Sequence, residues 1–273
     1  MQQTQSIEPA RCAEMIRRAG SVIALTGAGL STAAGIPDFR GPRGLYVTRR
    51  YDPEKVFDVD WFRHEPRYFY EFCRDFVAEV KDIDPTFTHR FLAELEDQGR
   101  LTAIITQNID MLHQLAGSHA VVELHGSPRA ASCTSCGKRF AELTYDWWEK
   151  VMTTSPMAPV PCCPACLGVI KPEIVFFGEL VDWYGEAERL VAQCDLLLVL
   201  GSSLQVAPAS FLPHGTQATT IVVNRGEVML PPAPHRYFVD GELDVFFREV
   251  AGHLGKLQKG PQRPQGPTSP CCP

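Results

Sequence analysis

Two pairs of cysteines have the spacing of metal ligands. Cys133-Thr-Ser-Cys136 and Cys163-Pro-Ala-Cys166 are C-x-x-C pairs, and 26 residues separate them. Each pair can place two thiolates on one tetrahedral Zn²⁺, and a site closed by four thiolates has a structural role. Cys162 adjoins the second pair and is an alternative ligand, although the position of Lys171-Pro172 favours Cys163. A redox role is the weaker interpretation because two pairs occur and neither lies in a thioredoxin-like pattern.

A glycine turn follows the first buried strand that the sequence predicts. The apolar run Val22 to Leu25 leads into Gly27-Ala28-Gly29, and Ser31 then stands where a helix N-cap would be. A strand, a glycine turn and a helix start leave backbone N–H groups free to bind a phosphate. Thr32 stands where the usual dinucleotide motif has its third glycine. From the tripeptide alone, a tight turn that requires glycine is the simpler interpretation.

Polar residues also follow the other apolar runs. Leu101 to Ile105 leads to Gln107, Asn108 and Asp110, and the next run leads to His125. Ligands of parallel sheets bind where the strands end, and a neutral imidazole is a natural general base near pH 7. Asn and Asp are also ordinary turn residues, and a lone His is more often structural than catalytic. Three further predicted strands end in Gly201-Ser202-Ser203, Asn224-Arg225 and Asp240.

Strands alternate with helical segments along the chain, which indicates an α/β fold around a parallel sheet. Apolar residues recur at helical spacing over residues 12–19 and 243–254. Asp84 as N-cap and Pro85 as the first helical residue predict the start of another helix. Ile174 to Phe177 has the composition of a short buried strand.

The composition is that of an ordinary globular protein. The chain of 273 residues is 45% hydrophobic, and its formal net charge is −6. An acidic chain is a poor general binder of nucleic acid, whereas a lysine-rich protein tail would be attracted to it. Residues 1–10 are polar, and the run Leu196 to Leu200 is far too short to span a bilayer. We therefore expect a cytoplasmic protein without a signal peptide or a membrane partner, and a disordered tail over residues 256–273.

The glycine turn is part of a longer run that points to a family. Gly-Ala-Gly-x-Ser-x-x-x-Gly-Ile-Pro-Asp-Phe-Arg, from Gly27 to Arg40, resembles the NAD-binding signature of the sirtuins. These are NAD-dependent protein lysine deacylases. Further blocks that resemble the family follow in its order: residues 106–110, His125-Gly126, the four cysteines, residues 171–179, and the strand ends at Gly201 and Asn224. The resemblance extends from about residue 21 to residue 240, and chance agreement of so many blocks is negligible.

The resemblance implies a fold and a division of the chain. Sirtuins have a Rossmann-like parallel sheet, the DHS-like NAD-binding fold, together with a smaller zinc-binding and helical domain. The NAD-binding domain would comprise residues 1–41, 84–126 and 172–255. Residues 42–83 would form a cofactor loop and a helical insertion, and residues 127–171 a Cys₄ zinc module. The many aromatic residues of the insertion have two interpretations. They would form the core of a helical subdomain, or some of them would line a narrow apolar tunnel beside the cofactor.

The resemblance also implies an activity. A sirtuin removes acyl groups, most often acetyl, from protein lysines, with NAD as cosubstrate and a structural Zn²⁺. The acyl oxygen attacks C1′ of the nicotinamide ribose, and the products are nicotinamide, free lysine and O-acyl-ADP-ribose. His125 would be the general base, and Asn108 would be the second catalytic residue.

The family pattern assigns binding residues as well. NAD would contact Gly27, Ala28, Gly29, Ser31, Asp38, Phe39, Arg40, Gln107, Asn108, Ile109, Asp110, Gly201, Ser202, Ser203, Asn224, Arg225 and Asp240. The acyl-lysine peptide would pair by β-strand addition with Val175, Phe176, Gly178 and Glu179.

The helical insertion bears on the preferred acyl group. Sirtuins that favour succinyl or malonyl lysine carry a Tyr and an Arg three residues apart in this segment, and the Arg pairs with the acyl carboxylate. Cys73 and Phe76 stand at those positions here, so we expect a preference for neutral acyl groups.

Two other functions remain open at this point. One is an NAD-dependent ADP-ribosyltransferase or NAD glycohydrolase that uses the same pocket. The other is a non-enzymatic interaction module built on the zinc site, although the presence of His125, Asn108 and Asp110 argues against it. The sequence does not specify the substrate proteins, and a monomer is the default expectation for the oligomeric state.

Overall fold

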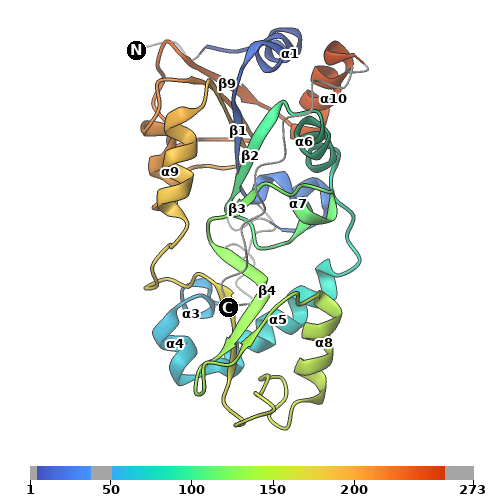
Figure 1. Ribbon diagram of the computed structural model, residues 1–273, viewed down its shortest axis with the longest axis vertical. Helices are drawn as coiled ribbons and strands as arrows, with labels where there is room; N and C mark the ends of the chain where they lie inside the picture. The colour runs from blue at the N-terminus through green and yellow to red at the C-terminus, as the bar shows by residue number, and fades with distance from the viewer. Residues whose placement is uncertain (1–4, 38–50, 256–273) are drawn as a thin grey trace.

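A parallel sheet forms the larger unit of the molecule (Figure 1). The computed structural model describes residues 5–37 and 51–255. Within them the sheet has six strands in the order β3-β2-β1-β7-β8-β9, which is the strand order of a doubly wound dinucleotide-binding fold. The predicted α/β class with a Rossmann-like parallel sheet is therefore confirmed. The strands are β1 (Val22–Thr26), β2 (Leu101–Thr106), β3 (Val121–Glu123), β7 (Leu196–Leu200), β8 (Thr219–Asn224) and β9 (Arg236–Asp240).

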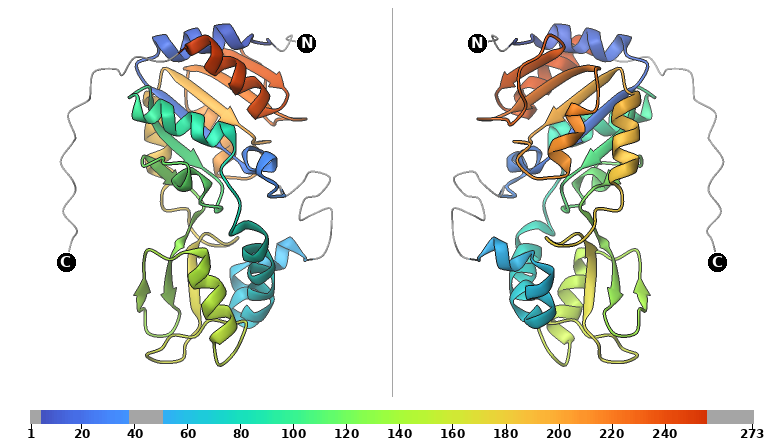
Figure 2. Two further views of the ribbon diagram at one scale, coloured as in Figure 1. Left: turned by 90° about the vertical axis from the view of Figure 1, so that its right-hand side faces the viewer. Right: turned by 90° about the vertical axis from the view of Figure 1, so that its left-hand side faces the viewer.

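Both faces of this sheet are covered, which explains why its central strands are apolar along their whole length. Every residue of β1 and β7 is buried. Val22 and Ala24 belong to the core with α1 (Pro9–Arg18), α6 (Phe87–Asp97) and α10 (Leu243–Leu254). Ile23 and Leu25 belong to the opposite core with α9 (Tyr184–Gln193) and the 3₁₀ helix η3 (Ala209–His214). Figure 2 shows the two helical layers on either side of the strands.

The helix α6 begins later than the sequence predicted. Its N-cap is Thr86, whose hydroxyl accepts a hydrogen bond from the His89 amide while His89 Nδ1 accepts one from the Thr86 amide. Asp244 of α10 accepts hydrogen bonds from the next two amides, at 3.0 and 2.9 Å. The assignment of Asp84 as N-cap is wrong because a capping box and a carboxylate from a distant helix satisfy the first turn.

A smaller unit lies at the other end of the molecule (Figure 1). Its antiparallel sheet has the order β5-β4-β6, with β4 (Gly126–Cys133), β5 (Arg139–Phe140) and β6 (Ile170–Ile174). Its helices are α3 (Pro53–Val56), α4 (Val59–His64), α5 (Pro66–Val80) and α8 (Tyr145–Thr154). Edge-to-face contacts join Phe62 to Phe69 and to Phe176, so part of the aromatic insertion forms a helical core. The predicted division into sequence domains stays a prediction.

The chain passes between the two units after β6. The expected strand from Ile174 to Phe177 is wrong, because β6 ends at Ile174. Phe177 instead forms an isolated bridge with Asp58, at the start of α4. None of the helices in the described parts of the chain has the length and apolar character needed to cross a membrane.

Two glycine turns meet at the centre of the larger sheet. The Gly27 amide donates to Leu200 O at 3.0 Å, and the Gly29 amide donates to Gly201 O at 2.8 Å. A Cβ atom on Gly29 would lie 2.9 Å from Gly201 Cα, and one on Gly27 would lie 2.8 Å from Gly201 O. The glycines of this motif are therefore required by direct contact between two backbones, whatever ligand they also serve.

Replacing Gly29 by Ala should destabilise the protein. The added methyl group would overlap with the backbone of Gly201. Overpacking of this kind typically lowers the free energy of unfolding by about 1–3 kcal/mol. Gly252→Ala is the matched control, since Gly252 lies in α10 with no atom near its Cβ position. That change should stabilise the protein by about 0.5–1 kcal/mol. Urea unfolding of both variants measures the difference, and equal stability of Gly29→Ala and wild type would contradict the packing argument.

Candidate active site and metal centre

The polar residues predicted at the strand ends lie along one edge of the parallel sheet. Thr26, the last residue of β1, pairs in register with Thr106 of β2 and Leu200 of β7. In the sheet, β2 is the neighbour of β1 on one side and β7 is its neighbour on the other. The strand order therefore reverses direction between β1 and β7, and this is the switch point of the topology. Ligands of such sheets bind in the crevice at this point.

A network of hydrogen bonds ties the first glycine turn to the loop after β2. Ser31 Oγ donates to Asp110 Oδ2 at 2.5 Å, and the Leu112 amide donates to Asp110 Oδ1 at 3.0 Å. Asn108 Nδ2 donates to Gly27 O at 3.1 Å. Burial raises the pKa of the Asp110 carboxyl group, and the bonds from Ser31 and Leu112 oppose this shift. Asn108, Asp110 and Ser31 thus form one constellation.

The glycine turn itself differs from the expected helix start. It forms two 3₁₀ turns, η1 (Ala28–Leu30) and η2 (Thr32–Ala34), and the Ser31 side chain makes no cap. The amides of Gly27, Gly29, Leu30 and Ser31 already donate to carbonyl groups of the chain. The expected helix start is therefore wrong, whereas phosphate binding at this turn stays a prediction, since the amides of Ala28, Thr32 and Ala33 donate to no carbonyl group among the described residues.

His125 lies beside the same network. Its Nδ1 atom is 2.9 Å from Gln107 O, which fixes the tautomer with the proton on Nδ1 and leaves Nε2 as a base. Burial lowers the pKa of the imidazole, and the Gln107 carbonyl opposes this shift. The side chain is therefore neutral at pH 7. Its backbone carbonyl accepts a hydrogen bond from the Val175 amide at 2.8 Å, which holds the segment after β6 against it.

The strand end of β7 joins this group through a glutamine. Gln107 Nε2 donates to Ser202 Oγ at 2.9 Å, so one side chain spans from β2 to β7. Ser202 Oγ also accepts a bond from the Leu204 amide at 3.2 Å, and Ser203 O accepts one from the Met229 amide at 2.9 Å. The predicted residues Gly201 and Ser202 are therefore neighbours of the first glycine turn, and Ser203 contacts Met229 instead.

A cavity of about 270 Å³ lies at the ends of β8 and β9. Asn224 and Asp240 line it, together with apolar side chains such as Phe238. Asp240 Oδ1 accepts a hydrogen bond from the Gly226 amide at 3.0 Å. Arg225 lies outside the cavity wall and forms an exposed ion pair with Glu242. Asn224 and Asp240 therefore line the same cavity, whereas Arg225 does not line it.

The predicted peptide-binding segment is already tied to its own chain. The amides of Val175, Phe176 and Glu179 donate to His125 O, Glu179 Oε2 and Phe176 O. Glu179 also pairs with Lys171 at 2.9 Å. Gly178 has a φ of +94°, which ends any extended strand here. The contact of Val175, Phe176, Gly178 and Glu179 with a peptide stays a prediction, and the segment is not an open edge strand.

Three residues assigned to NAD binding cannot be placed. Asp38, Phe39 and Arg40 lie outside the residues that the structure describes.

Two buried histidines behind β1 escaped the sequence analysis. His113 Nε2 is 2.9 Å from the hydroxyl of Thr26, the residue before the glycine turn. The His113 ring lies 4.8 Å, centroid to centroid, from the His89 ring. Burial lowers the pKa of both, to about 3 for His89, so both are neutral and support the site without titrating near pH 7. The spacing Thr86-x-x-His89 is a capping-box signal that could have revealed one of them.

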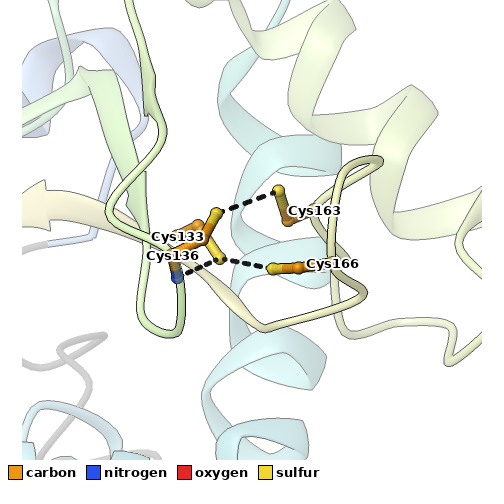
Figure 3. A group of neighbouring side chains, drawn as sticks. All are labelled: Cys133, Cys136, Cys163 and Cys166. Carbon is orange, nitrogen blue, oxygen red and sulfur yellow. Dashed lines mark hydrogen bonds between the residues drawn. The ribbon is translucent and has the colours of Figure 1, made fainter.

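Four cysteines form a compact group, as Figure 3 shows. The Sγ atoms of Cys133, Cys136, Cys163 and Cys166 all lie within 4.8 Å of one another. The amides of Cys136 and Ser135 donate to Cys133 Sγ and lower the pKa of that thiol to about 6, which favours the thiolate form that binds a metal. Two C-x-x-C turns facing each other with four sulfur ligands fit a tetrahedral Zn²⁺.

The cysteine group includes Cys163 and not the adjacent Cys162. Cys163 belongs to it, whereas the thiol of Cys162 is directed at Val160 O, 3.7 Å away. Two ligands come from the β4–β5 hairpin and two from the loop before β6, so a metal here would hold together parts of the smaller unit that are distant in sequence.

Replacing Cys163 by Ser should remove stoichiometric zinc and lower the melting temperature. The binding energy of a structural zinc is folding energy, and a serine hydroxyl is a poor substitute for thiolate. Cys162→Ser is the matched control and should keep both the metal and the stability. Metal analysis and thermal unfolding of the purified variants check this, and loss of zinc from Cys162→Ser alone would reverse the assignment.

Comparisons with known proteins point to one family. The model of the Sir2 family matches residues 27–208. An NAD-dependent protein deacetylase 1 of Pyrobaculum aerophilum is 42% identical over 220 residues, which cover 79% of this chain and 83% of that protein. An NAD-dependent protein deacetylase of Sulfolobus acidocaldarius is 37% identical over 258 residues, covering 92% and 97%.

A solved structure shares the fold at similar identity. It is a Sir2 protein with a deacetylated p53 peptide and 3′-O-acetyl ADP-ribose, at a TM-score of 0.80 and 37% identity. The match covers 89% of this chain and 97% of that one.

Proposed function

The chain belongs to the Sir2 family, and on that premise we propose how its strand-end crevice removes acyl groups from protein lysines. The protein is an NAD-dependent protein deacylase that uses a structural zinc. The observation that carries this function is the near full-length match to deacetylases and to a complex of peptide with acetyl ADP-ribose. This support favours deacylation over an ADP-ribosyltransferase, a glycohydrolase or an interaction module.

The crevice offers separate places for the parts of NAD. Ala28 and Ser202, at the two meeting turns, are proposed to face the phosphates, since the Ala28 amide and a serine hydroxyl are hydrogen-bond donors. Asn224 and Asp240, which line the cavity of about 270 Å³, are proposed to face the adenosine end. Asn108, Ile109 and Asp110 are proposed to enclose the nicotinamide, where the buried network around Asp110 limits water.

His125 is proposed as the general base. The hydrogen bond from Nδ1 to Gln107 O orients the ring and leaves Nε2 free to take a proton from a ribose hydroxyl. NAD supplies the electrophilic sugar carbon that accepts the acyl oxygen, and nicotinamide departs. The lowered pKa of His125 keeps this base unprotonated at neutral pH.

The acyl end of the substrate is proposed to enter the smaller unit. Cys73 and Phe76, the two positions that bear on acyl choice, both line an apolar cavity there. No lysine or arginine is among the described residues of its wall, so a carboxylate would be desolvated without a partner. This supports a preference for neutral acyl groups.

Acyl-lysine proteins are the substrates that this function requires. A peptide is present in the similar solved structure, and an acyl-lysine segment is proposed to approach the loop after β6. A cytoplasmic location, a monomeric state and the lack of nucleic-acid partners stay predictions.

Incubation with NAD and an acetyl-lysine peptide should yield nicotinamide, free lysine peptide and O-acetyl-ADP-ribose by mass spectrometry. His125→Ala should lower kcat/KM by about 10²–10⁴-fold, the usual contribution of a general base. Because the pKa of His125 is lowered from 6.5, the wild-type kcat/KM should be constant above pH 6.5. It should fall at lower pH, where the imidazole becomes protonated and can no longer act as a base.

The exposed His119 before β3 provides the matched control, and His119→Ala should retain full activity. Transfer of ADP-ribose to protein without loss of the acetyl group would favour the transferase alternative. Full activity of His125→Ala would remove the proposed role of the imidazole.

Acetyl-lysine should be turned over at least tenfold faster than succinyl-lysine in the same peptide, because a buried unpaired carboxylate is costly. Phe76→Arg supplies a cation at the cavity wall and should narrow this ratio. Comparison of kcat/KM for the two peptides measures it. A wild-type preference for succinyl-lysine would overturn the assignment of neutral acyl groups.

A further inference from the structure

Tyr145 of α8 carries a buried hydroxyl that lacks a hydrogen-bond partner among the described residues. Its side chain is 7% exposed. Buried hydroxyl groups are normally paired, and an unpaired one calls for an explanation. The neighbouring Tyr70 shows the ordinary case, because its hydroxyl donates to the carbonyl oxygen of Ile170.

Both tyrosines line the same apolar cavity, which has a volume of about 40 Å³. Apart from these two rings, its wall consists of hydrocarbon and sulfur side chains from α5, α8, the strands β4 and β6, and nearby loops, and of the Trp148 indole, whose N–H group donates to Pro128 O. One water-sized group requires roughly 10–15 Å³ in this measure, so the cavity has room for about three heavy atoms. The space therefore suits a short group that is mostly apolar.

The cavity adjoins the reaction site. Ile109 lines it and lies in the chain between Asn108 and Asp110. Ile174 also lines it and precedes Val175, whose amide donates to His125 O. Ile109 and Ile174 thus connect the wall of the cavity to the segments that hold Asn108, Asp110 and His125.

The chemical state of the Tyr145 hydroxyl is well defined. Burial raises its pKa, and the negative charge of the Asp110 carboxylate raises it further. The phenol is therefore protonated, and it offers one donor and one acceptor at the boundary between the cavity and the Asp110 network.

We propose that Tyr145 selects acyl groups that carry a hydroxyl near their end, with 3-hydroxybutyryl-lysine as the representative substrate. The inference rests on the deacylase function proposed above. A 3-hydroxybutyryl group exceeds acetyl by three heavy atoms, which is the room that the cavity provides. Its hydroxyl would pair with that of Tyr145, while its methyl group contacts the apolar wall. A purely apolar chain of equal size leaves the phenol unpaired.

The test compares two substrates of the same size. Isovaleryl-lysine has a methyl group where 3-hydroxybutyryl-lysine has its hydroxyl, so the pair isolates the hydrogen bond. Wild-type enzyme should show about tenfold higher kcat/KM for the better enantiomer of the hydroxyacyl peptide. Tyr145→Phe keeps the ring and should bring this ratio to about one or lower.

Tyr70→Phe is the matched control. It removes a hydroxyl from the same cavity wall, but one that is already bonded to Ile170 O. It should lower the melting temperature and leave the substrate ratio unchanged. Tyr145→Phe should keep or raise the melting temperature, because its hydroxyl makes no bond that the fold loses.

The outcomes separate this inference from the deacylase function. Failure of the wild-type enzyme to release nicotinamide with acetyl-lysine peptide would count against the deacylase function itself. Turnover of acetyl-lysine with a substrate ratio near one, or a ratio that Tyr145→Phe does not change, would overturn the role of Tyr145 alone. A large loss of stability in Tyr145→Phe would show that the hydroxyl is paired, and would also overturn it.

Discussion

The close contact between the turns after β1 and β7 is the constraint on which the rest of the site depends. Gly29 and Gly201 meet backbone to backbone, with a hydrogen bond of 2.8 Å between them. Gly201 has a φ of +63°, and a Cβ atom there would lie 2.3 Å from the Leu30 amide nitrogen. Because side chains are absent at this contact, polar groups from β2 and β7 approach each other across β1, and Gln107 reaches Ser202.

The polar groups of the crevice are arranged so that most need no water. Asp110 is held by Ser31 and the Leu112 amide, and His125 by Gln107 O. His113 supports Thr26 from behind as a neutral ring. Fixed partners of this kind keep a base and a carboxyl group oriented before any ligand arrives, which is the form of preorganisation that lowers the cost of reaction.

The smaller unit has a core of a different kind. Its core is built from aromatic rings and from two loops that four cysteines draw together. The interior of this unit is incompletely filled at the apolar cavity that residues of α5 and α8 line. The same unit contains both this cavity and the segment before Val175, whose amide donates to His125 O.

The sequence by itself determined the parts that depend on local pattern. These are the apolar strands, the glycine turn, the two C-x-x-C pairs and the polar residues at strand ends, because each is written in neighbouring residues. The family followed from the order of those blocks. The roles of individual residues in binding and catalysis, and the domain limits, stay predictions.

Only the tertiary structure decided which polar groups find partners. Asp244 accepts a hydrogen bond from the Phe87 amide of α6, 157 residues away, and Thr86 is the N-cap in place of Asp84. Ser31 bonds Asp110 instead of capping a helix, and the amides of the loop after β6 bond within the chain. The residues next to Tyr145 in the sequence do not indicate that its hydroxyl is unpaired. Each depends on contacts between segments far apart in the chain, and a linear pattern does not specify which distant group arrives at a given donor or acceptor.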